Sequence, residues 1–81
     1  MRIRIVSDGR VFEGTAEQIV QQLQYIAFGK GEATLAEYVD WLAAQVARQE
    51  GVELEVEGAN GREKAAALVK AMIGAGLAVK V

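Results

Sequence analysis

Three glutamates, Glu53, Glu55 and Glu57, occupy every second position of one short segment and form a dense row of carboxylates. Such a row has the ligand type of a hard-cation site and the groups of an acid–base pair. In an extended strand, however, same-face neighbours lie about 6.5 to 7 Å apart, too far for one strand to wrap an ion. We therefore interpret the row as a solvated strand face that pairs with basic neighbours, namely Arg2, Arg4 and Lys80.

Histidine and cysteine are both absent from the sequence, and Ser7 is its single serine. Without them there is no imidazole or thiolate ligand, no disulfide and no histidine to activate the serine. We therefore expect no catalytic residue, no metal site and no cofactor, and we do not expect the protein to be an enzyme. An enzyme with an unrecognised Asp, Lys or Tyr site stays open as a minor alternative.

The segment Gly29-Lys30-Gly31-Glu32 lies between two predicted helices and resembles the GXXG loop of KH nucleic-acid-binding domains. In that family the loop grips the phosphate backbone, so the resemblance implies weak nucleic-acid binding through Lys30. The resemblance covers one loop, and Glu32 stands where the motif has a glycine. The alternative is a helix C-cap followed by a flexible connector. Because the formal net charge is −2, nucleic acid is not an expected partner, although the C-terminal third is basic, with Arg62, Lys64, Lys70 and Lys80.

Three aromatic side chains fall outside the apolar stripes of their predicted helices. At about 100° per residue, Tyr25 points almost opposite its apolar face, Phe28 lies to one side, and Trp41 is displaced by roughly a third of a turn. We predict that Tyr25, Phe28 and Trp41 bind a protein partner or a second copy of the chain, as in a homodimer. The alternative is that Trp41 fills a seam between helices, Phe28 folds under the loop and Tyr25 keeps its hydroxyl in water. The leading hypothesis is thus a small intracellular protein-interaction or self-associating accessory module.

The elements that position these residues begin with a β-hairpin. Asp8-Gly9 is a favoured two-residue turn between two alternating runs. With this turn, Ile5 faces Phe12 on the buried side of the ribbon and Arg4 faces Glu13 on the exposed side.

Three helices follow from capping residues and apolar spacing. Thr15, Thr34 and Asn60 each precede a Gln or Glu by three residues, which is the capping-box spacing. Glycines end the helices, at Gly29, Gly51 and Gly74. The apolar stripes are Ala16, Ile19, Val20, Leu23, Ile26 and Ala27; Leu35, Tyr38, Val39, Leu42 and Val46; and Ala65, Leu68, Val69 and Met72.

Two further alternating segments predict strands, at residues 52–57 and 77–81. In the second of these we expect Leu77, Val79 and Val81 to be buried. The predicted order is ββααβαβ, and the fold class is α/β, in the form of an α+β two-layer sandwich. We expect a mixed four-stranded sheet in the order 2-1-3-4, with the last two strands parallel to the first and three helices on one face.

A chain of 81 residues provides for one hydrophobic core, so we expect a single compact domain over residues 1–81. The sequence contains no run near the roughly 18 apolar residues that a membrane span requires. We therefore expect no membrane partner and a cytoplasmic location.

Overall fold

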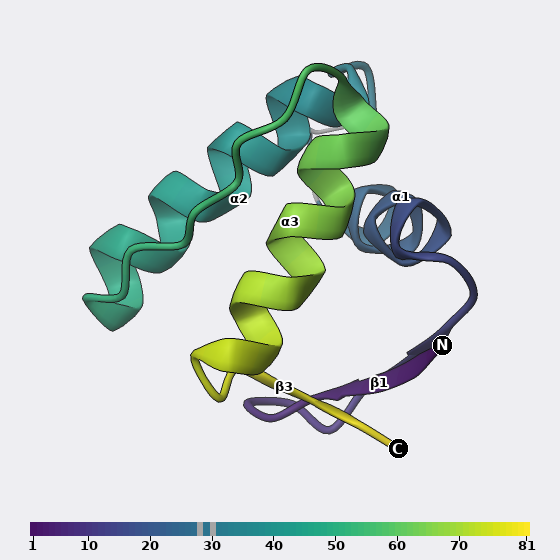
Figure 1. The fold of residues 1–81 in the computed structure, drawn as a ribbon, viewed down its shortest axis with the longest axis vertical. Helices are drawn as coiled ribbons and strands as arrows, with labels where there is room; N and C mark the ends of the chain where they lie inside the picture. The colour runs from purple at the N-terminus through teal and green to yellow at the C-terminus, as the bar shows by residue number, and fades with distance from the viewer. Residues whose placement is uncertain (28, 30) are drawn as a thin grey trace.

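In residues 1–27, 29 and 31–81, which the computed structural model describes, three helices cover one face of a three-stranded antiparallel sheet (Figure 1). The elements in chain order are β1 (Arg2–Ile5), β2 (Val11–Glu13), α1 (Ala16–Ile26), α2 (Leu35–Glu50), α3 (Gly61–Gly74) and β3 (Ala78–Lys80). The combination of helices and sheet confirms the predicted mixed class. The order, however, is ββαααβ instead of ββααβαβ.

The predicted four-stranded mixed sheet is wrong in its number of strands and in their direction. Among the described residues the sheet has three strands in the order β2-β1-β3, and β1 pairs antiparallel with both neighbours. The C-terminal strand therefore lies directly beside β1, where the predicted order 2-1-3-4 put residues 52–57.

The hairpin between β1 and β2 has a longer loop than the Asp8-Gly9 pair predicts. The N–H of Ile5 donates to the carbonyl oxygen of Arg10 over 2.8 Å, so residues 6–9 form the loop. Within it the Asp8 side chain accepts a 2.9 Å hydrogen bond from the Arg10 N–H, and Gly9 has φ +75°, where glycine is favoured. A four-residue loop thus replaces the predicted two-residue turn.

The longer loop shifts the cross-strand pairs by two residues. Phe12 faces Ile3 instead of Ile5, and Glu13 faces Arg2. Because side chains alternate between faces with a period of two, a shift of two keeps every side chain on its predicted face. The predicted pairs are wrong, whereas Phe12 is buried and Glu13 exposed as predicted.

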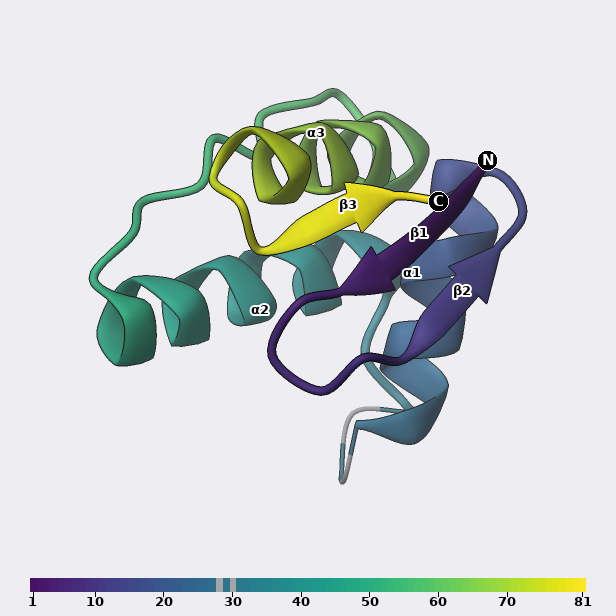
Figure 2. The ribbon, with the colours of Figure 1, turned by 90° about the horizontal axis from the view of Figure 1, so that it is seen from below.

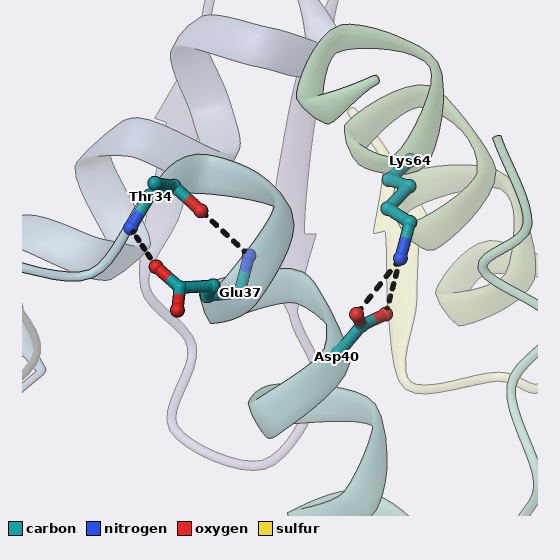
Figure 3. Close-up of polar contacts among 4 residues, drawn as sticks. All are labelled: Thr34, Glu37, Asp40 and Lys64. Carbon is teal, nitrogen blue, oxygen red and sulfur yellow. Dashed lines mark hydrogen bonds and ion pairs between the residues drawn. The ribbon is translucent and has the colours of Figure 1, made fainter. Parts of the chain in front are cut away.

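Each helix begins after its predicted capping residue. The side chains of Thr15, Thr34 and Asn60 all accept a hydrogen bond from the backbone N–H three residues further on. At α2 the Glu37 carboxylate in turn accepts from the Thr34 N–H over 2.9 Å (Figure 3). Gly51, with φ +68°, ends α2 in the left-handed region. The three N-caps and Gly51 are confirmed, whereas α1 ends earlier than the predicted Gly29, with Ala27 as its cap, and Gly74 is the last residue of α3, which Ala75 caps.

Helices α2 and α3 start at the same end of the molecule. A β-carbon on Gly61 would lie 3.1 Å from the Leu35 β-carbon, so the first turns of the two helices touch. One turn further on, Lys64 Nζ lies 2.8 Å from both carboxylate oxygens of Asp40 (Figure 3). From this shared end the helices diverge toward their C-termini (Figure 1).

The segment 52–57, predicted as a strand, connects the end of α2 to the start of α3 and belongs to no sheet. None of its backbone groups forms a hydrogen bond with the rest of the described chain. Helix α2, with 16 residues, is about 24 Å long. The six extended residues 52–57 span about 20 Å, most of the distance from the end of α2 back to its start. Leu54 and Val56 pack against the core while the glutamates between them are exposed. The alternation therefore reflects an extended connector with one side on the helices and the other in water.

Strand β3 buries the opposite face from the predicted one, so Ala78 faces the core and Val79 does not. Ala78 pairs with Ile5 and is fully buried, so Val79 lies on the outer face of the sheet. The turn after α3 sets this alternation, since the Leu77 N–H donates to the Met72 carbonyl oxygen over 2.9 Å just before the strand begins.

The core lies between the sheet and the three helices, and Figure 2 shows the opposite face of the sheet without a helix on it. The largest fully buried side chains come from β1 and all three helices: Ile3, Ile19, Val20, Val39, Leu68 and Val69. Leu23, Trp41 and Leu42 are partly buried around them. This core fixes the relative positions of the surfaces described below.

Candidate functional site

The outer side of α1 carries the most exposed aromatic residue among those described. Tyr25 is 90% exposed, and Ile26 beside it is 49% exposed. The exposure of Ile26 corrects the prediction that it belongs to the buried stripe. In Figure 2 the last turn of α1 extends beyond β2, so the end of the stripe has no strand beneath it.

This side of α1 is almost without charge. Glu17 is the one charged residue of the helix. Three of its exposed positions are occupied by glutamines, namely Gln18, Gln21 and Gln22. We call the set Gln18, Gln21, Gln22, Tyr25 and Ile26 the α1 surface. Together with Phe12 and the exposed Glu13 of β2, it lines a shallow hollow. There the Gln22 side chain donates a 3.0 Å hydrogen bond to the Glu13 carbonyl oxygen and ties the helix to the strand.

Trp41 does not share this surface. Its ring centroid lies 5.9 Å from that of Tyr38, with the planes tilted by 32°, and the side chain packs against the core. No described residue of α2 lines the hollow beside Tyr25. Phe28, the third predicted contact residue, lies outside the described residues. Of the two predicted contact residues that the structure describes, Tyr25 lies on the α1 surface and Trp41 does not.

The glutamate row 53–57 is exposed, as predicted, but its predicted basic neighbours are wrong. Because the segment is not in the sheet, Arg2 and Arg4 lie on a different part of the molecule. In the described chain the ion pairs join Asp8 to Arg10 at 3.7 Å and Asp40 to Lys64 at 2.8 Å, and neither includes this row. Within the same residues no three carboxylates converge as the ligands of a metal ion would.

The KH-like loop, residues 29–32, is described only in part. Lys30, on which the nucleic-acid alternative depends, lies outside the described residues. Gly29 has φ +77°, in the left-handed region that favours glycine. In the basic C-terminal third, Lys64 is already paired with Asp40 (Figure 3).

A pocket of about 370 Å³, which the sequence did not predict, lies where α2 and α3 diverge. Its walls come from the hairpin, from α2 between Tyr38 and Glu50, from Leu23 of α1, from Met72 near the end of α3 and from the turn before β3. Most of the lining is apolar and includes Phe12, Leu42, Val46, Met72 and Leu77. Its volume and apolar lining are in the range of small-molecule sites.

Tyr38 lines the same pocket and brings a polar group to it. The residue is 2% exposed, and its hydroxyl has no hydrogen-bond partner within the described chain. Within the described chain, every side-chain oxygen that lacks a hydrogen-bond partner is accessible to solvent, so the Tyr38 hydroxyl is accessible too. The pocket is the open space that Tyr38 lines. Burial raises the pKa of Tyr38 to about 12, which keeps the hydroxyl protonated at neutral pH. Sequence spacing identified Tyr38 as a core position but gave no sign of the open space beside it.

In the part of the chain that the structure describes, no helix combines the length and the apolar content needed to cross a membrane. Comparisons with protein-family models, with curated proteins and with solved structures find no match for this chain. The α1 surface and the pocket are therefore the features of the chain that indicate a function.

Proposed function

We propose that this chain is a small protein-interaction module that self-associates through the α1 surface. The observation that carries the proposal is the 90% exposure of Tyr25 on a helix with a single charged residue. Aromatic residues are enriched and charges are depleted at the centres of protein interfaces. The proposal assigns no catalytic role to any residue.

The uncharged composition of the α1 surface favours a second copy of the chain as the partner. Most homodimers are two-fold symmetric, so the same patch contacts itself and like charges near the axis would repel. A glutamine amide both donates and accepts hydrogen bonds and can therefore pair with its own copy. Gln18, Gln21 and Gln22 line the same hollow as Tyr25. The Gln18 amide oxygen already accepts from the Thr15 N–H, and the Gln22 amide nitrogen donates to Glu13, so Gln21 is the glutamine whose amide is not used within the described chain.

The size of the α1 surface sets the expected affinity. A large aromatic side chain buries about 150 to 250 Å², so two copies of Tyr25 with their neighbours form an interface below the area of stable dimers. We therefore expect a weak homodimer, with a dissociation constant on the order of 100 µM.

Sedimentation velocity over a range of about 1 µM to 1 mM protein tests this proposal. The wild-type mass should rise from monomer toward dimer, and Tyr25→Glu should stay monomeric because it places two charges in one dry contact. Ala44→Glu is the matched control, since it adds the same charge to an exposed position of α2 and should dimerise like the wild type. A wild-type monomer at about 1 mM, or equal dimerisation of Tyr25→Glu, would overturn the proposal.

A further inference from the structure

We infer that the pocket between the hairpin loop, α2 and the turn before β3 binds a small, uncharged, mainly apolar molecule that carries one hydrogen-bond acceptor. This site is separate from the α1 surface: the residues that line the two hollows share Phe12 alone, which lies beneath both. The inference therefore does not depend on self-association.

The pocket follows from the way α2 and α3 are joined. Gly61 against Leu35, and Lys64 against Asp40, hold the N-terminal halves of the two helices together. The helices diverge beyond that point (Figure 1), and the pocket lies along α2, between the hairpin loop and the turn before β3. Leu42, on α2, therefore faces an open volume of about 370 Å³ as well as the core.

The Tyr38 hydroxyl indicates the chemistry of the occupant. A hydroxyl at the wall of an apolar pocket can hydrogen-bond either to water or to a polar group of a ligand. This hydroxyl has no partner in the described chain, and it reaches the pocket. A tyrosine hydroxyl is protonated at neutral pH and can donate a hydrogen bond, so a ligand acceptor such as a carbonyl oxygen matches it.

The charged groups of the pocket exclude an anionic ligand. Two carboxylates, those of Asp8 and Glu50, are among its lining residues, and no basic residue is. Arg10 lies 3.7 Å from Asp8 and offsets part of one charge, which leaves Glu50 without a described ion-pair partner. A carboxylate or phosphate head group would therefore be repelled, whereas an uncharged ketone, ester or amide would not.

The volume sets the size of the ligand. If a water-sized group takes about 30 Å³, then 370 Å³ holds roughly ten non-hydrogen atoms. The ketone 2-nonanone has this size and one acceptor oxygen. Nonane lacks the acceptor, and nonanoate carries the excluded charge, so the three form a matched series of probes.

Titration of the full chain with each probe, followed by calorimetry and by Trp41 fluorescence, tests the inference. The 2-nonanone should bind below about 1 mM and much more tightly than nonanoate. Tyr38→Phe keeps the ring and removes the hydroxyl, so the affinity for 2-nonanone should fall about fivefold to tenfold while that for nonane stays the same. Tyr25→Phe, a change outside the pocket, should alter neither affinity.

A second variant places the ligand in the pocket even if Tyr38→Phe disturbs the core. Gln49→Trp changes a lining residue at the end of α2 and should weaken binding of 2-nonanone and nonane alike by partly filling the volume. Thermal unfolding confirms that each variant is folded. Failure of 2-nonanone to bind at about 1 mM, or binding that neither variant changes, would overturn the inference.

Discussion

Gly61 and Leu35 approach so closely that a β-carbon on Gly61 would lie 3.1 Å from the Leu35 β-carbon and 3.2 Å from the backbone nitrogen of Ala36. This contact brings the start of α3 against the start of α2. The connector 52–57 returns along α2 to reach this contact, and beyond it the two helices diverge toward their C-termini (Figure 1).

Gly61→Ala should therefore destabilise the protein by about 1 to 3 kcal/mol, because a backbone atom of α2 cannot move away from the added methyl group as a side chain can. Alanine is otherwise the better helix former, so Gly74→Ala is the control. Gly74 is in the same helix with nothing within 4 Å of its added β-carbon. Urea unfolding compares the two variants. Equal or greater stability of Gly61→Ala would mean that the helices are not in this close contact.

Phe12→Ala should cost about 3 to 5 kcal/mol, because it removes a buried aromatic side chain opposite Ile3. Glu13→Ala should cost less than about 1 kcal/mol, since its side chain is exposed and the Gln22 hydrogen bond uses its backbone oxygen. Chemical denaturation measures both. Comparable losses from the two substitutions would show that the hairpin faces are assigned wrongly.

The loss of folding stability at acidic pH should depend on Glu37. The Thr34 backbone N–H, and then the Thr34 hydroxyl, hold the pKa of this carboxyl below its ordinary value. A pKa lowered by folding adds stability above the unfolded-state pKa, and that stability is lost as the pH falls through the folded-state pKa. Unfolding curves from about pH 6 to pH 3 should therefore show a smaller loss in Glu37→Gln than in the wild type. An unchanged loss would contradict the capping role of this carboxylate.

The loss of folding stability at alkaline pH should depend on Tyr38. Burial raises its pKa from 10.0 to about 12, so between these values the unfolded state loses a proton that the folded state keeps. Stability therefore falls as the pH rises from about 10 to about 12. The fall should be smaller in Tyr38→Phe, and unfolding curves at stepped pH compare the two proteins. Identical pH dependence would mean that the Tyr38 hydroxyl is solvated.

The helices could be predicted from the sequence because their signals are local. Thr15, Thr34 and Asn60 cap the turn that follows them, and Gly51 ends α2 through its own φ of +68°. Neither effect requires knowledge of the distant chain.

The sheet could not be predicted in full. An alternation of apolar and polar residues indicates that one side of an extended segment is buried, but it does not indicate that the segment is hydrogen-bonded to another strand. Residues 52–57 alternate because they lie along helices, and β3 is inverted because the turn at Leu77 sets which of its residues face inward. The pocket lies between elements that are distant in the sequence, the hairpin loop, α2 and the turn before β3, so no local signal predicts it. Of the candidate aromatics, spacing predicted the exposure of Tyr25 but could not show that Trp41 packs on Tyr38.

The most direct test of self-association through the α1 surface is a map of backbone amide NMR shifts as the protein is concentrated. The amides of Gln21, Gln22, Tyr25 and Ile26 should move together between about 10 µM and 1 mM, while those near the Asp40–Lys64 pair stay fixed. Contradiction would come from amides that do not move over this range. It would also come from shifts that gather on the outer face of the sheet, around Val11 and Val79.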